Sequence, residues 1–266
     1  MARRRWLPVP SPLLAVLSLS ATTLGCGGGT ALPKGGPAVA GPAEVAPHAC
    51  KPDDLADCTI QCAKHHAASC VHLGLMYEGG RGVARDEVRA SALYQQACDV
   101  GEAHGCSDLA FLYETGKGVE KDEARAAALY EQACHAGEVH GCGNLGFLCE
   151  TGHGVAKDQA RAVALYRQAC DGGDPHGCGN LGFLYEAGNG VDRDEARAVA
   201  LYRQACDGGE AHGCGNLGFL YETGKGVDRD EARAVTLYKQ ACDAGDAHGC
   251  TNLDRLRSVQ HVSESR

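Results

Sequence analysis

Aromatic residues and positive charge are scarce in this chain of 266 residues. Aromatic side chains make up 5% of the sequence, the single tryptophan is Trp6, and the formal net charge is −9. No basic stripe remains once the first residues are set aside, so the electrostatic footprint of a nucleic-acid-binding protein is missing. We therefore expect no nucleic-acid partner.

A hydrophobic run long enough to span a membrane is also lacking. The N-terminus has three arginines, then an apolar stretch that is short and interrupted by prolines, then small residues before Cys26. This order is typical of an export signal rather than of a membrane span. The stretch "TTLGC" resembles a bacterial lipoprotein cleavage box, although Thr23 stands where leucine is usual. Cys26 is thus the predicted lipidation site, which would make the lipid the only membrane contact, and plain secretion is the alternative.

The segment after the signal differs in composition from the rest of the chain. Residues 27–49 are rich in Gly, Pro and Ala and have no apolar period, which predicts a flexible linker. The folded part is expected to begin near residue 50. Sixteen cysteines are too many for a reducing cytosol, so the sequence predicts an exported protein, either lipid-anchored at the periplasmic side of a membrane or secreted.

Cysteine marks an internal repeat. Cys70, Cys106, Cys142, Cys178, Cys214 and Cys250 follow one another at intervals of 36 residues, and the stretch "CGNLGFL" occurs three times. A period of this length indicates stacked supersecondary units.

Each unit contains two amphipathic segments. In residues 106–141, Leu109 and Leu112 recur at helical spacing in the first half, as Leu129 and Ala133 do in the second. Glycines separate the halves, and Asp122 stands where a helix needs an N-cap acceptor. The predicted fold is all-α: a right-handed α-solenoid with a cap helix in residues 50–69, five repeats in 70–249, and a cap helix and tail in 250–266.

The pattern L-G-x-x-Y-x-x-G-x-G-V, followed by D, A, Y and A-C, resembles the Sel-like repeat family, close kin of the tetratricopeptide repeats, over residues 53–257. A C-x7-C pair in every repeat resembles the secreted cysteine-rich proteins of that family, which are filed as the Hcp beta-lactamase family. The resemblance implies a scaffold whose helix pairs are linked by disulfides. It also implies penicillin binding and weak lactam hydrolysis, which are ascribed to some members.

Each C-x7-C pair joins the end of one helix to the beginning of the next. A glycine-containing turn between them folds the helices antiparallel, which brings the two Cα atoms within the ~4.4 to 6.8 Å that a disulfide requires. Each closed ring of about nine residues would contribute roughly 2 to 3 kcal/mol. The predicted bridges are Cys62–Cys70, Cys98–Cys106, Cys134–Cys142, Cys170–Cys178, Cys206–Cys214 and Cys242–Cys250.

Zinc is the competing use of these cysteines, with a histidine before the second cysteine of five pairs as a third ligand. Structural zinc sites need four convergent ligands, and each repeat offers two cysteines and one histidine. The equivalent histidines of stacked repeats would lie about 10 Å or more apart. We therefore expect no metal and no other cofactor, and expect each ring to hydrogen-bond locally. The histidines are His104, His140, His176, His212 and His248.

Besides Cys26, three cysteines fall outside the repeating pairs. Cys149 stands where other repeats have tyrosine, so it is either a buried thiol that fills the place of the ring or a reactive one. Cys50 and Cys58 have the same spacing as the other pairs. Because Cys58 aligns with a position in the middle of a helix, these two can pair only if the segment around Pro52 doubles back.

No catalytic constellation is evident. The chain lacks the S-x-x-K, S-D-N and K-T-G motifs of serine lactamases, and "TGKGV" closes a helix instead of forming a phosphate loop. Near-identical units favour a uniform surface over a unique pocket. A row of asparagines is the candidate groove: Asn144, Asn180, Asn216 and Asn252.

Three functions remain open at this point. The first is a scaffold that binds an envelope protein, a peptide or a cell-wall fragment, because repeat architecture supplies an extended surface. The second is a beta-lactam-binding protein with weak lactamase activity, which depends on the family resemblance alone. The third is a purely structural element of the envelope. If the chain is an enzyme, the resemblance implies a lactamase-like hydrolase, and its catalytic residues are unknown.

Overall fold

The structure is a computed structural model that describes residues 49–264. Cys26 and the preceding signal therefore lie outside the described residues. Within this range the chain forms twelve α-helices and no strand. They are α1 (Leu55–Ala63), α2 (Ala67–Gly79), α3 (Glu87–Asp99), α4 (Ala103–Thr115), α5 (Glu123–His135), α6 (Val139–Thr151), α7 (Gln159–Asp171), α8 (Pro175–Ala187), α9 (Glu195–Asp207), α10 (Ala211–Thr223), α11 (Glu231–Asp243) and α12 (Ala247–Glu264).

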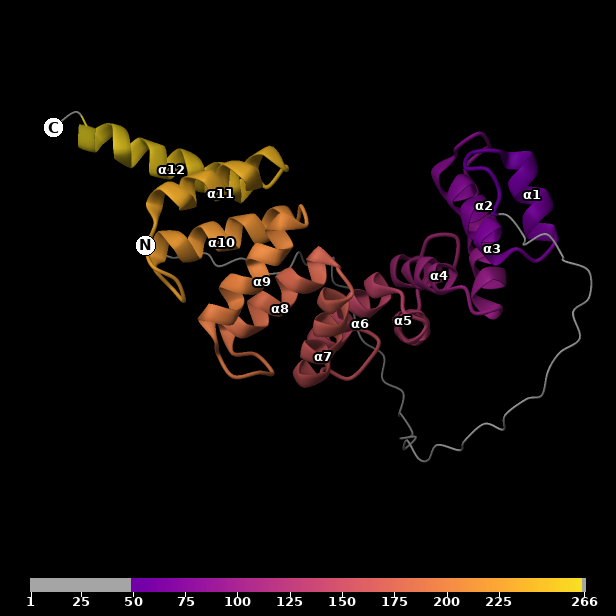
Figure 1. The fold of residues 1–266 in the computed structure, drawn as a ribbon. Coiled ribbons are helices and arrows are strands. Elements are labelled where there is room, and N and C mark those ends of the chain that lie inside the picture. Colours follow the sequence, from indigo (N-terminus) through magenta and orange to yellow (C-terminus); the bar gives the residue numbers. More distant parts are fainter. Residues whose placement is uncertain (1–48, 265–266) are drawn as a thin grey trace, which may run out of the picture. The chain divides into compact units, whose positions relative to one another are not determined.

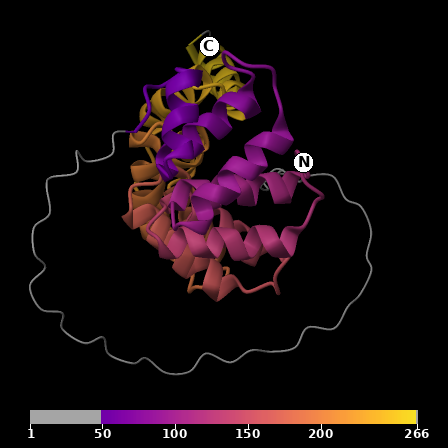
Figure 2. The same ribbon diagram turned by 90° about the vertical axis from the view of Figure 1, so that its right-hand side faces the viewer.

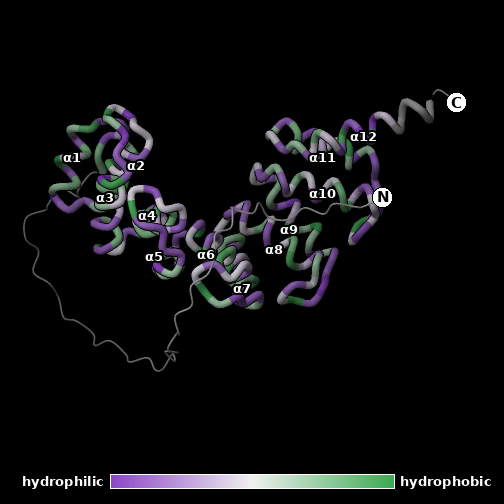
Figure 3. The backbone as a smooth tube through the Cα atoms, turned by 180° about the vertical axis from the view of Figure 1, so that it is seen from behind, coloured by the Kyte–Doolittle hydropathy of each residue, from purple (hydrophilic) through white to green (hydrophobic). Residues whose placement is uncertain are grey.

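The helices follow one another in chain order, and each packs against its neighbours in sequence (Figures 1 and 2). Several even-numbered helices also contact the next even-numbered helix, as α6 contacts α8 and α8 contacts α10. Hydrophobic residues recur within the helices, and hydrophilic segments separate them (Figure 3). The predicted α-solenoid is confirmed.

Two kinds of cap fix the helix ends. The odd-numbered helices α3 to α11 begin after an aspartate whose side chain accepts the backbone N–H three residues on, as Asp122 does from Arg125 at 2.9 Å. Helices α2 to α10 of the even-numbered series end at a left-handed glycine, such as Gly116 with φ of 74°. Glycine adopts this backbone conformation without the steric cost of a Cβ atom. The caps explain why the helices α2 to α11 all have 13 residues.

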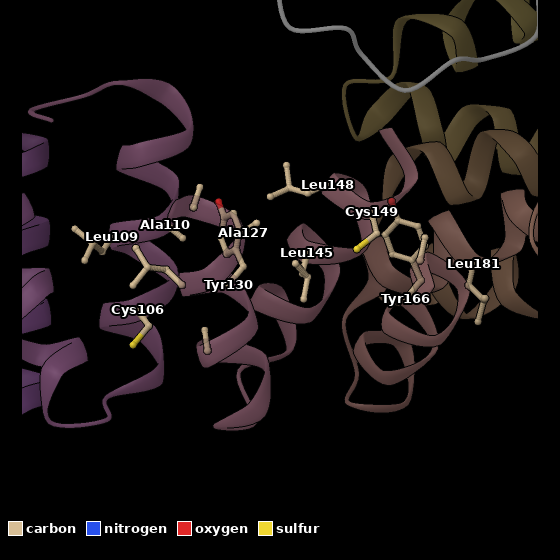
Figure 4. Close-up of a cluster of buried hydrophobic side chains, with 14 of the residues drawn as sticks. Cys106, Leu109, Ala110, Ala127, Tyr130, Leu145, Leu148, Cys149, Tyr166 and Leu181 are labelled. Carbon is tan, nitrogen blue, oxygen red and sulfur yellow. The ribbon is translucent and has the colours of Figure 1, made fainter. Parts of the chain in front are cut away.

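Tyrosine rings form the centre of each repeat. Tyr166 of α7 is fully buried against Gly146 of α6, where an added Cβ would lie 2.9 Å from the ring. Its hydroxyl donates to Glu150 at 2.9 Å, so the buried polar atom is satisfied. Figure 4 shows Tyr130 and Tyr166 among the leucines of neighbouring helices. The same tyrosine–glutamate bond recurs at Tyr94, Tyr130, Tyr202 and Tyr238. The glycine contact recurs at Tyr94, Tyr202 and Tyr238, whereas on α4 Ala110 stands in the place of the glycine.

The described chain contains seven disulfides, six of which connect consecutive helices, and this confirms that the solenoid is stapled by disulfides. Six of them join the end of an odd-numbered helix to the first turn of the next helix, with Cα–Cα distances of 4.5 to 4.6 Å, and they are Cys62–Cys70, Cys98–Cys106, Cys134–Cys142, Cys170–Cys178, Cys206–Cys214 and Cys242–Cys250. These are the pairs expected from the spacing. Each crosses a turn that reverses the chain direction.

The structure also pairs Cys50 with Cys58, at a Cα–Cα distance of 4.8 Å. The sequence left this pair open because it did not show where α1 begins. The helix begins only at Leu55, and the residues before it form a turn in which the Asp54 N–H donates to the Lys51 carbonyl at 3.1 Å. The chain thereby doubles back before the helix, as pairing requires.

At the other end, α12 is the last helix of the described range. Asp254 stands where Gly218 of α10 receives a tyrosine ring, and Arg257 stands where α10 has Tyr221. Both side chains of α12 are exposed. The face of α12 that corresponds to the tyrosine-binding face of α10 is therefore polar. None of the helices in the described range is both long and apolar enough to cross a bilayer.

Candidate functional site

A row of polar and aromatic side chains lies along the even-numbered helices. On α6 it consists of His140, Asn144 and Phe147, which are spaced four and three residues apart and so share one helix face. We call the full set the His/Asn/Phe stripe. Its other members are His104, Asp108 and Phe111 on α4, His176, Asn180 and Phe183 on α8, His212, Asn216 and Phe219 on α10, and His248 and Asn252 on α12.

The stripe is hollowed between α6 and α8. A pocket of about 190 Å³ is lined there by His140, Gly143, Asn144, Phe147, Asp174, His176, Gly177 and Asn180. Two of the four predicted asparagines, Asn144 and Asn180, therefore come together in one pocket. Asn216 and Asn252 hold the equivalent places on α10 and α12 and do not line it. The pocket combines groups from two consecutive repeats.

A buried carboxylate forms the base of this pocket. Asp174 is 3% exposed and accepts the backbone N–H groups of His176 and Gly177, both at 3.1 Å. It thus caps α8. Gly143 of α6 leaves room for it, since an added Cβ there would lie 3.0 Å from Asp174 Oδ2. The close approach of Asp174 therefore explains why a glycine follows the cysteine in "CGNLGFL".

The histidines do not all bond locally, which corrects the prediction. His104 Nδ1 lies 3.1 Å from Glu102 in its own turn, as predicted. His140 Nδ1 instead faces Asp174, the N-cap of α8, at 3.6 Å, and His212 Nδ1 faces Asp246, which precedes α12, at 3.8 Å. The sequence could not show this contact because it depends on how one repeat stacks on the next. Within residues 49–264, no three histidine, cysteine, aspartate or glutamate side chains converge as metal ligands.

Asn144 lies beside one of the tyrosine–glutamate bonds of the core, in which the Tyr130 hydroxyl donates to Glu114 at 2.9 Å. Burial, followed by the charge of Glu114, raises the pKa of the Tyr130 hydroxyl far above its ordinary value. The tyrosine stays neutral and acts as a fixed donor to the carboxylate.

The stripe changes character on α4, where Asp108 replaces the asparagine. Burial, then the charge of Glu78 and, to a smaller extent, that of Glu138 raise the pKa of the Asp108 carboxyl to about 6, and His104 opposes the shift. The sequence analysis did not single out this residue. Aligning the repeats on their cysteines shows it, because Asp108 lies two residues after Cys106 as Asn144 lies two after Cys142.

Cys149 is buried, with no exposed surface, and it is the free cysteine of the described chain. Burial raises the pKa of its thiol, which disfavours the reactive thiolate. It lies beside the ring of Tyr166 in the core (Figure 4). Of the two alternatives, the structure shows the buried one. Tyr185, at the equivalent place on α8, bonds Arg167 at 2.9 Å and Arg197 at 3.2 Å. Near Cys149 the first arginine is replaced by Glu131 and only the second is kept, as Arg161.

The Sel1 repeat model matches the chain at residues 67–102, 103–138, 139–174, 175–210 and 211–246. These repeats begin three residues before the units that the cysteines mark, so disulfides such as Cys98–Cys106 join consecutive repeats. Among curated proteins none matches the chain.

Several solved structures are similar. A Sel1 repeat protein from Oxalobacter formigenes is 28% identical with a TM-score of 0.68, over 72% of this chain and 76% of that one. The protective antigen c5321 of uropathogenic Escherichia coli, which has an SLR fold, is 27% identical with a TM-score of 0.69. The match covers 75% of this chain and 43% of that protein.

Helicobacter pylori cysteine rich protein B is 31% identical over 50% of this chain and 96% of its own, with a TM-score of 0.42. The five matched repeats cover residues 67–246, more than half of the sequence. The chain belongs to the Sel1 repeat family.

Proposed function

We propose that this protein is an exported scaffold, held at the cell envelope by a lipid on Cys26, that binds an extended segment of another protein along the His/Asn/Phe stripe. A Sel1 repeat array is suited to protein binding, since stacked repeats present a long continuous surface. The observation that carries the proposal is the pocket between α6 and α8, where two repeats contribute the same groups.

The chemistry of the pocket fits a polypeptide backbone. A peptide offers one N–H and one C=O per residue, and an asparagine amide both donates and accepts, so it can pair with either group. The half-buried Phe147 ring supplies apolar surface for a side chain. Since packed helices lie about 8 to 10 Å apart and an extended chain rises about 3.3 Å per residue, one repeat matches roughly three residues of ligand.

The number of disulfides supports the proposal that the protein is exported to an oxidising compartment. Seven bridges in one chain are typical of an oxidising extracellular or periplasmic environment. The lipid anchor is supported by the sequence before Cys26 alone. Its test is the substitution Cys26→Ser. We expect the variant to leave the membrane fraction and to lose metabolic labelling by fatty acid, and retention of both would contradict the anchor.

Binding is tested with the oxidised protein and a display library of random 15-residue peptides. Peptides selected on the wild type should bind in fluorescence anisotropy, and the double variant Asn144→Ala, Asn180→Ala should weaken them about tenfold, which is ~1.4 kcal/mol. Gln168→Ala, which changes an exposed amide of α7 outside the stripe, is the matched control and should bind normally. Failure to select any peptide would overturn the proposal. So would peptides that bind the double asparagine variant as tightly as the wild type.

A further inference from the structure

The members of the His/Asn/Phe stripe on one helix form one step of the stripe. The step on α4 differs in charge from the others. Asp108 occupies the place of Asn144 and Asn180, the two residues that line the pocket between α6 and α8. An asparagine amide donates and accepts, whereas an ionised carboxylate only accepts. A ligand group that binds Asp108 must therefore be a hydrogen-bond donor. The amides at the same position on α6 and α8 can bind a donor or an acceptor.

The basic residues of this repeat are already engaged elsewhere. Residues 103–138 contain three of them: Lys117, Lys121 and Arg125. Lys117 lies over the Phe111 ring at 4.8 Å, and Lys121 pairs with Glu123 at 2.7 Å. Arg125 lies over Tyr113 at 4.4 Å and donates to Gln95 at 3.3 Å. None of them forms an ion pair with Asp108 in the described part of the chain.

The groups that face Asp108 add negative charge. Glu78 of α2 accepts the Tyr94 hydroxyl at 2.8 Å, and Glu138, which is 6% exposed, precedes α6. Both carboxylates raise the pKa of Asp108, and His104 of its own helix is the cation that opposes them. His104 Nδ1, however, lies 3.1 Å from Glu102. The carboxyl of Asp108 is thus partly removed from water without a counter-ion of its own, which is costly for its charged form.

We infer that Asp108 is a specificity-determining residue of the stripe and that the bound segment carries a lysine or arginine side chain at the α4 step. This inference rests on the proposed function. A basic side chain would supply the missing counter-ion and the donor. Phe111, three residues on, remains 40% exposed with Lys117 over its ring, and this exposed part offers apolar surface for the aliphatic stem of that side chain. The α6 and α8 steps, with asparagine in this place, bind the backbone without regard to charge.

Two matched substitutions test the inference in the same peptide selection. Asp108→Asn gives α4 the residue of the other steps, and Asn180→Asp places a carboxylate on α8. Peptides selected on the wild type should be enriched in lysine or arginine, and changing the enriched residue to glutamine should weaken binding to the wild type about tenfold. The same change should alter binding to Asp108→Asn less than twofold. Asn180→Asp should select peptides with a second basic residue about six positions away.

A pH series gives an independent readout. The preference for the basic peptide over its glutamine counterpart should fall between pH 7.5 and pH 5, as Asp108 is protonated. The titratable groups that face it are Glu78, Glu138, His104, Tyr94 and Tyr130, and burial raises the pKa of both tyrosines far above this range. Selected peptides without basic enrichment, or a preference that survives Asp108→Asn, would overturn the inference and leave the proposed function standing. If no peptide is selected at all, the proposed function itself fails, and the specificity assignment with it.

Discussion

Replacing Asp108 by asparagine is expected to stabilise the solenoid at neutral pH and to have little effect near pH 3.5. The ordinary pKa of the carboxyl is 3.8, and in the folded protein it is about 6 because of burial and the charge of Glu78. A carboxyl whose pKa rises on folding binds its proton more tightly in the folded state. Its contribution to stability is therefore complete below pH 3.8 and is lost as the pH rises through 6.

The magnitude follows from this shift. A difference of about two units corresponds to about 3 kcal/mol, at ~1.36 kcal/mol for each unit. Because part of the Asp108 side chain is exposed to solvent, which screens its charge, we expect Asp108→Asn to raise the free energy of unfolding by about 1 to 2 kcal/mol at pH 7.5. The gain should shrink as the pH falls from 6 toward 4, since the protonated aspartate and the asparagine are then both neutral.

Urea denaturation followed by circular dichroism, with the disulfides intact, measures this difference at pH 7.5, 5 and 4. Asp192→Asn in an exposed loop is the matched control and should change stability by less than about 0.5 kcal/mol at each pH. A destabilised Asp108→Asn protein at pH 7.5 would refute the reasoning. So would a stabilisation of the same size at all three values, since it would not depend on the charge of Asp108.

Three further predictions concern the scaffold. The double substitution Cys206→Ala, Cys214→Ala should lower the free energy of unfolding by about 2 to 3 kcal/mol, because it opens a ring of nine residues. An unchanged urea midpoint, or a circular dichroism spectrum that resists excess reductant, would contradict the stapling role. Tyr166→Phe leaves Glu150 without its buried donor and should cost about 1 to 2 kcal/mol, whereas wild-type stability in the same titration would show that the bond is dispensable. Gly146→Ala forces a Cβ to within 2.9 Å of that ring and should cost about 1 to 3 kcal/mol, with Gly79→Ala, whose Cβ meets nothing closer than 3.6 Å, as a control that melts normally.

Much of the fold could be read from the repeat alone. The 36-residue period, the glycines and the capping aspartates are local signals, and each recurs often enough to be recognised. The six repeating disulfides follow from the same signals, since a cysteine at the end of one helix and another in the first turn of the next must lie close if the turn is tight. Such features depend on residues near in sequence.

Features that join one repeat to the next could not be read in this way. The pocket that unites Asn144 with Asn180, and the approach of His140 to Asp174, depend on the stacking of helices that are 36 residues apart. A repeating sequence shows that equivalent side chains form a row. It does not show where along this row the surface forms a pocket.

The sequence by itself determined an all-α array of stapled repeats, because helix period, caps and cysteine spacing are set by neighbouring residues. The tertiary structure decided whether Cys50 forms a disulfide, which depends on where α1 begins. It also decided whether the Cys149 thiol is buried, which depends on the side chains that cover it. In addition, only the tertiary structure shows that ionisation of the Asp108 carboxyl is energetically costly. Burial and the carboxylates of Glu78 and Glu138 raise its pKa, and neither influence is visible before the helices are packed.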